Sequence, residues 1–199
     1  MRQFALTCLS AAVGCILAGP ASAGVKVSSV EQTYQIRGRT GAALLTQMDR
    51  RGPRHGLLTR AVAQTRYSIY WDLVWVRQNG ACRVKSADGV LFITYIYPQV
   101  ASPLPRSLQQ RWRRFMAGVR EHERKHGQIA VQMARAAERS AKTVAFNRDP
   151  SCRRSRAEVN RRIGAVYARY EQQQADFDTV EHRENGPVEK LINSLISGR

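Results

Sequence analysis

Bulky and polar side chains alternate along residues 67–75, where Tyr67, Ile69, Trp71, Leu73 and Trp75 occupy every second position. A period of two places these five side chains on one face of a β-strand. Asn-Gly at positions 79–80 and Asp-Gly at 88–89 are typical tight-turn dipeptides, and residues 90–97 form another apolar segment. The pattern therefore predicts a three-stranded antiparallel meander over residues 67–97. A further strand is expected at residues 24–36, where valines alternate with polar residues.

In the second half of the chain the apolar period changes to three and four residues, which indicates helices. A capping box, Ser-Leu-Gln-Gln at 107–110, is expected to start a long helix, and a second box at 155–158 is expected to start another. Short helices are expected at residues 40–48 and 188–196. The apolar stripe of the first long helix consists of Leu108, Trp112, Phe115, Val119, His122, His126, Ile129 and Met133. We therefore predict an α+β fold, in which the antiparallel meander packs against two long C-terminal helices.

The N-terminal residues have the features of a signal peptide. Arg2 supplies a positive start, an apolar run follows at residues 4–17, and Ala-Ser-Ala at 21–23 is a cleavage site. The run is shorter than the ~20 residues that a membrane-spanning helix needs. An alternative, a lipoprotein modified at Cys15, stays open, although the residues before this cysteine fit the usual lipid-attachment signal poorly. We therefore expect an exported protein, periplasmic or secreted, with a single domain at residues 24–199.

Export changes the interpretation of the four cysteines. Cys8 and Cys15 would leave with the signal peptide, so the mature chain keeps Cys82 and Cys152. In an oxidising compartment an even pair most simply indicates one disulfide. A role as metal ligands has little support, because neither cysteine belongs to a C-x-x-C pair.

The chain is strongly basic, with 32 lysines and arginines against 15 acidic residues and a net charge of +17. The electrostatic field of so much positive charge attracts polyanions. For an exported protein, an anionic envelope surface is a more suitable partner than nucleic acid. No nucleic-acid-binding fingerprint is visible in the sequence. A solvated surface without a specific partner is an equally good explanation.

The predicted first long helix also carries the motif His122-Glu123-Arg-Lys-His126, which has the form H-E-x-x-H. Two histidines four residues apart lie on one helix face, about 5–6 Å apart at Cβ. Both rings can therefore reach one zinc ion at about 2.0 Å, while Glu123 is placed to act on water. The alternative is a pair of core histidines, but each buried ring would then need its own hydrogen-bond partner. The motif favours a metal site.

A catalytic zinc ion needs a third protein ligand and keeps one position for water. Positions 129 and 132 are Ile and Gln, so the glycine and histidine of the metzincin extension are absent. Glu138 lies about 18 Å further along the helix and is too far away. His182 is the favoured third ligand, and Asp178, four residues earlier, could orient its ring. The alternatives are His55, Glu181 and Glu184. Tyr170, Arg183 and His55 are equal candidates for stabilising an oxyanion.

In their order, these features resemble a family of predicted secreted bacterial zinc-dependent proteases, a domain family of otherwise unassigned function. The matching stretches are residues 34–38, 45–53, the strand with Trp71 and Trp75, residues 82–84, 112–115, 122–126, Cys152, and Phe177-Asp178 followed by a histidine. The resemblance implies zinc on His122 and His126, Glu123 as the base, and a pairing of Cys82 with Cys152. The family pattern has a glycine after its late histidine, whereas this chain has Arg183 after His182.

The sequence thus predicts an exported zinc-dependent metallopeptidase, in which Glu123 is the general base for hydrolysis of peptide or amide bonds. Its expected partners are a peptide or protein substrate and an anionic envelope surface. The alternative is a non-catalytic, basic, envelope-binding module with a structural metal ion. The oligomeric state is not indicated by the sequence.

Overall fold

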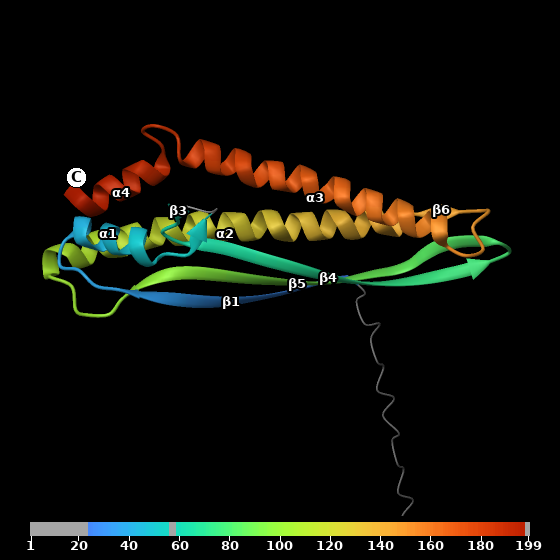
Figure 1. Cartoon of the computed structure of the whole chain (residues 1–199), viewed down its shortest axis with the longest axis horizontal. Coiled ribbons are helices and arrows are strands. Elements are labelled where there is room, and N and C mark those ends of the chain that lie inside the picture. Colours follow the sequence, from blue (N-terminus) through green and yellow to red (C-terminus); the bar gives the residue numbers. More distant parts are fainter. Residues whose placement is uncertain (1–23, 56–58, 198–199) are drawn as a thin grey trace, which may run out of the picture.

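A computed structural model describes residues 24–55 and 59–197, which form two sheets and four helices (Figure 1). The predicted signal peptide, residues 1–23, lies outside the described residues. In chain order the elements are β1 (Val25–Ile36), α1 (Gly41–Arg51), β2 (Arg54–His55), β3 (Thr59–Arg60), β4 (Gln64–Gln78), β5 (Ala81–Val100), α2 (Arg106–Lys142), β6 (Ala145–Phe146), α3 (Arg153–Glu181) and α4 (Pro187–Ser197). The predicted α+β class with two long C-terminal helices is confirmed.

Strands β4 and β5 form a long antiparallel hairpin around Asn79-Gly80. Both turn residues have positive φ, 51° for Asn79 and 76° for Gly80. This conformation is the one that favours Asn-Gly in a two-residue hairpin. The turn predicted at residues 79–80 is confirmed.

The turn predicted at Asp88-Gly89 is wrong, because β5 continues without interruption to Val100. The third strand beside β5 is β1, which runs parallel to it from the pair Val25↔Gly89 to the pair Ile36↔Val100. Gly89 has a packing role in this strand. A Cβ at this position would lie only 2.9 Å from the Trp71 ring. Glycine therefore allows the tryptophan of β4 to lie flat against β5.

Both long helices begin earlier than the predicted capping boxes. Helix α2 starts at Arg106 directly after Pro105, so the hydroxyl of Ser107 does not cap it. Helix α3 starts at Arg153, and the carboxylate of Asp149 accepts hydrogen bonds from the backbone N–H and the hydroxyl of Ser155. An acidic side chain upstream of the helix thus satisfies the free amides of its first turn.

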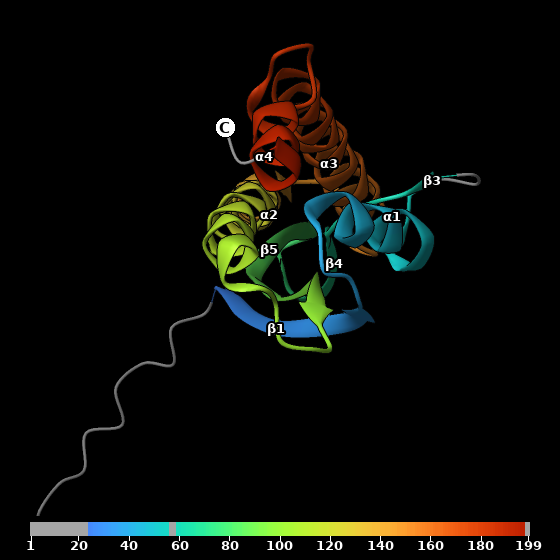
Figure 2. The ribbon, with the colours of Figure 1, turned by 90° about the vertical axis from the view of Figure 1, so that its left-hand side faces the viewer.

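Helix α2 packs against both the sheet and α3 (Figure 2). Two sets of small residues allow this close packing. Ala130 and Ala134 face Leu91 and Ile93 of β5, and Ala136 on another side of the helix packs near Val166 of α3. As a result, α2 presents one face to the sheet and another to α3, and the side chains between α2 and α3 come from segments far apart in the sequence.

A disulfide joins Cys82 of β5 to Cys152 at the start of α3, with the two Cα atoms 5.3 Å apart. The predicted disulfide is therefore present, and it ties the sheet to the second long helix. Among the described residues, no helix is both long and apolar enough to cross a membrane.

Candidate metal centre

The His-Glu-x-x-His motif lies near the middle of α2, and its members point to different neighbours. His122 and His126 face the C-terminal part of α3, with side chains 12% and 13% exposed. Glu123 faces the sheet and is 5% exposed. The two imidazoles therefore occupy the interface between the helices, and the glutamate occupies the interface between helix and sheet.

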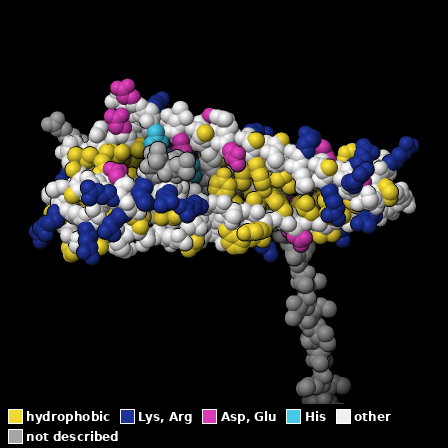
Figure 3. Space-filling view, viewed as in Figure 1, with side chains coloured by type: hydrophobic (Ala, Val, Ile, Leu, Met, Phe, Trp, Pro, Cys, Tyr) yellow, Lys and Arg dark blue, Asp and Glu magenta, His cyan; other side chains and the backbone are white. Residues whose placement is uncertain are grey.

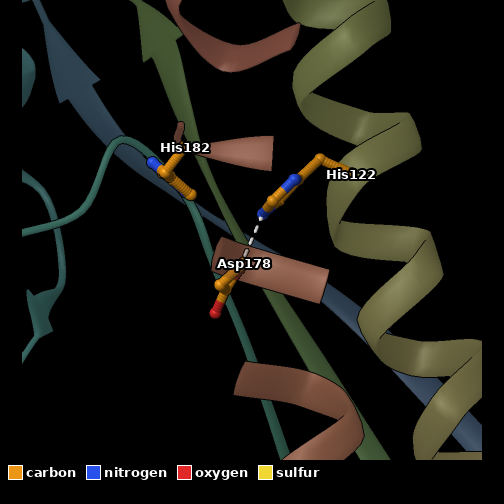
Figure 4. Close-up of side chains that lie close together, drawn as sticks. All are labelled: His122, Asp178 and His182. Atoms are coloured by element: carbon orange, nitrogen blue, oxygen red, sulfur yellow. Dashed lines mark ion pairs between the residues drawn. The ribbon is translucent and has the colours of Figure 1, made fainter. Parts of the chain in front are cut away.

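Three polar atoms converge at the histidines. The Nε2 atoms of His122 and His126 lie 3.1 Å apart. Oδ1 of Asp178, from α3, lies 3.0 Å from Nε2 of His126 and 3.4 Å from Nε2 of His122. In Figure 4 a dashed line marks the contact between His122 of α2 and Asp178 of α3. These atoms form a nearly equilateral triangle.

Gln174 fixes the orientation of the His126 ring. Its side-chain N–H donates to the carbonyl oxygen of His126 at 3.1 Å, so its amide oxygen must face the ring. That oxygen lies 2.6 Å from Nδ1 of His126, which therefore carries a proton and donates it. The Nε2 atom, which points into the triangle, can act as a ligand when it carries no proton. This arrangement is typical of the outer partners of metal-binding histidines.

The segment that ends α3 supplies further groups. His182 follows the last residue of α3, and its ring centroid lies 5.6 Å from that of His122. Ligand atoms of His122, Asp178 and His182 lie within 4.8 Å of one another. Oε2 of Glu181 lies 3.6 Å from Nδ1 of His122. Phe177 covers both imidazoles, with centroid distances of 4.9 and 5.1 Å.

The donor set fits a divalent metal ion. Two ligands at about 2.0–2.1 Å from one tetrahedral ion lie roughly 3.3 Å apart, and the triangle has edges of 3.0, 3.1 and 3.4 Å. Imidazole nitrogen and carboxylate oxygen are both ordinary zinc ligands. The histidine and aspartate group can therefore hold a metal ion.

Charge–charge interactions within this group are strong. Burial alone would raise the pKa of Asp178, but hydrogen bonds from His122 and His126 outweigh it and hold this pKa well below its usual range. Burial opposes protonation of His126, yet its bonds to Asp178 and Gln174 raise its pKa overall. The site thus holds an ionised carboxylate against the two rings. Figure 3 shows a histidine (cyan) at the surface close to acidic side chains (magenta).

Glu123 is held from the sheet side by Thr65 of β4. The Thr65 hydroxyl lies 2.6 Å from Oε2 of Glu123 and 3.0 Å from its carbonyl oxygen. Burial raises the pKa of Glu123, and the bond from Thr65 and the two imidazoles offset this rise only in part. The carboxylate therefore shares an electrostatic environment with both rings and is a stronger base than an exposed glutamate.

The structure places several sequence-predicted residues together and adds others. Asp178, expected to orient His182, instead contacts His122 and His126. His182 as the third metal ligand stays a prediction. Glu138 is paired with Lys142 further along α2, in keeping with its exclusion as a ligand.

Thr65 and Gln174 were not among the predicted site residues. The sequence carried a signal for Gln174, because residues 174, 178 and 182 are spaced by four and share one face of a helix. It carried none for Thr65, since a β-strand position does not reveal which helix residue it will contact.

A family model matches residues 31–186, which is more than three quarters of the chain and includes every residue of the metal centre and both disulfide cysteines. The chain belongs to this family, which is described as bacterial protein of unknown function (DUF922). That description names no activity. Neither the curated proteins nor the solved structures contain a match to this chain.

Proposed function

We propose that this protein is an exported zinc-dependent metallopeptidase that hydrolyses peptide or amide bonds. The observation that carries the proposal is the triangle formed by His122, His126 and Asp178, with edges of 3.0–3.4 Å and a buried glutamate next to it. His182 and Glu181 supply further donors at its border. We assign the ion to His122 and His126 together with Asp178 or His182.

A zinc ion bound there would polarise the scissile carbonyl and make water more acidic. Glu123 would take a proton from the attacking water and return it to the leaving amine. The Thr65 hydroxyl holds one carboxylate oxygen, Oε2, and so leaves the other oxygen of Glu123 for this proton. Gln174 keeps Nε2 of His126 directed into the site. Phe177 shields the two rings from water.

The expected signal peptide and the disulfide support a periplasmic or secreted location. The substrate would therefore be a polypeptide of the cell envelope or its surroundings. The surplus of basic residues supports retention at an anionic surface, with nucleic acid an unsuitable partner for an exported protein.

A second candidate is a non-catalytic module with a structural metal ion. One specific observation favours it: four protein groups, including His182, gather at the site, and a closed four-ligand set leaves no position for water. In that case Glu123 would have only a structural role, joining α2 to β4 through Thr65.

Replacement of the base separates these candidates. We expect Glu123→Gln to keep the zinc content of the wild type but to lower its hydrolysis of casein or a peptide library by at least about 100-fold. Glu121→Gln, an exposed neighbour on the same helix, is the matched control and should retain both properties. Zinc-loaded wild type without hydrolytic activity would support the structural site. Full activity of Glu123→Gln would exclude this residue as the base.

A further inference from the structure

The three long strands have one face that the helices do not cover, which we call the outer sheet face. Leu91 on the opposite face is fully buried against Ala130 of α2, so its neighbours Val90 and Phe92 point away from the helices. Paired residues of adjacent strands share a face. Three rows cross the centre of the outer sheet face: Lys26–Val90–Tyr70, Ser28–Phe92–Ser68 and Val30–Thr94–Arg66. Figures 1 and 2 show α2 and α3 on the other side of this sheet.

Large apolar side chains are concentrated on this face. Tyr70 is 66% exposed and Phe92 is 45% exposed, and their rings meet edge to face with centroids 6.2 Å apart. Val30 and Val74 belong to the same face, at 52% and 41% exposure. Four of the seven exposed large hydrophobic residues in the described part of the chain therefore gather here. Such a concentration marks an interaction surface more often than a bare solvent face.

Basic side chains lie beside the apolar centre. Lys26 of β1 and Arg66 of β4 end the central rows at opposite edges of the sheet, and both are exposed. Their long aliphatic stems can lie along the apolar surface while their charges reach outward. Asp72 and Asp88 form the next row and separate the three central rows from Val74. The patch thus combines interfacial aromatic rings with flanking positive charge.

We propose that the outer sheet face binds the surface of an anionic phospholipid bilayer. Tyrosine and phenylalanine rings suit the boundary between headgroups and acyl chains, and each nearby lysine or arginine gains from the negative surface potential. The net charge of +17 is complementary to such a surface. The same charge opposes a second copy of the chain on this face.

This surface is independent of the metal centre. The centre lies between α2 and α3, whereas the outer sheet face points away from both helices. A bilayer bound at Tyr70 and Phe92 would therefore leave α3 exposed to solvent. Binding to lipid can thus be tested whether or not the protein hydrolyses peptides.

Sedimentation with vesicles tests the proposal. We expect the protein to bind phosphatidylcholine vesicles that contain about one third phosphatidylglycerol and to bind pure phosphatidylcholine weakly. The double variant Tyr70→Ser/Phe92→Ser should lose roughly tenfold or more in apparent affinity, because the apolar contribution is removed. Val180→Ser/Ile196→Ser removes two exposed apolar residues elsewhere and should bind like the wild type. Circular dichroism on each variant verifies that it is folded.

Three results would overturn the proposal. One is equal binding to both vesicle types, which would mean that the anionic headgroup is not recognised. Another is wild-type binding by folded Tyr70→Ser/Phe92→Ser, which would place lipid contact on the arginine-rich remainder of the surface. The third is a wild-type dimer in light scattering that this double variant converts to a monomer, which would assign the outer sheet face to self-association.

Discussion

Gly127 allows α2 to approach β5 next to the metal centre. It lies one turn after Glu123 on the sheet-facing side of the helix, where a Cβ would be 2.1 Å from the hydroxyl oxygen of Tyr95 and 3.0 Å from Cζ of its ring. Thr65, which binds Glu123, and Tyr95 are direct partners in the β4–β5 pairing. Gly127→Ala therefore disturbs the contact that positions both Glu123 and His126.

The size of the effect follows from two opposing contributions. An ordinary contact requires at least 3.4 Å, so the added methyl group must displace Tyr95 or α2 by more than 1 Å. Overpacking of this kind costs about 1–3 kcal/mol. Alanine gains about 1 kcal/mol over glycine in helix propensity. The net result is a free energy of unfolding lower by up to about 2 kcal/mol, or a Tm lower by up to about 8 °C.

Urea denaturation of the wild type and four variants measures this effect. Gly164→Ala, on α3, is the matched control, because a Cβ there meets nothing within 4 Å. The same substitution should stabilise the protein by about 0.5–1 kcal/mol at that site. Tyr95→Phe removes the nearest oxygen, so the double variant Gly127→Ala/Tyr95→Phe should recover part of the lost free energy of unfolding. The single variant Tyr95→Phe completes this double-mutant cycle.

The reasoning is refuted if Gly127→Ala is as stable as Gly164→Ala. It is also refuted if Tyr95→Phe fails to relieve the loss, since the clash would then lie elsewhere. A further consequence is functional: displacement of α2 should weaken zinc binding by Gly127→Ala, and Gly164→Ala should bind zinc like the wild type.

Three other predictions concern the metal site and the fold. Gln174→Ala should weaken zinc binding by about 10–100-fold in calorimetry, whereas exposed Gln172→Ala should not. Replacing the disulfide with Cys82→Ala/Cys152→Ala should lower the free energy of unfolding by ~4 kcal/mol, because the bond closes a long loop. Burial opposes ionisation of Asp149, but bonds from Ser155 and backbone amides lower its pKa overall. The stability it contributes is therefore complete above about pH 4 and lost as pH falls through its lowered pKa, so the Tm difference between wild type and Asp149→Ala should shrink in acid.

The sequence predicted the elements of this fold where the local signal was strong. The Asn79-Gly80 turn, the β1 strand and both long helices follow from short-range patterns. The prediction of a turn at Asp88-Gly89 was wrong because Gly89 makes room for the ring of Trp71 on the neighbouring strand. Such a tertiary requirement overrides a local turn signal and cannot be seen in the dipeptide itself.

In the metal centre, too, local patterns were predictable from the sequence and tertiary contacts were not. His122 and His126 were predicted from their spacing, since one helix determines their relation. The position of Asp178 depends on how α3 crosses α2, which no local pattern specifies. Thr65 reaches Glu123 from β4, 58 residues away in the sequence. The histidine pair could therefore be predicted from the sequence, whereas the contacts between different helices and strands could not.

Calorimetric titration of chelator-treated protein with zinc tests the central claim most directly. The triangle of His122, His126 and Asp178 predicts one ion per chain in the wild type. It predicts no measurable binding by His126→Ala, whose fold is verified by circular dichroism. A wild-type protein that takes up no zinc, or a His126→Ala variant that binds zinc as tightly as the wild type, would contradict the account.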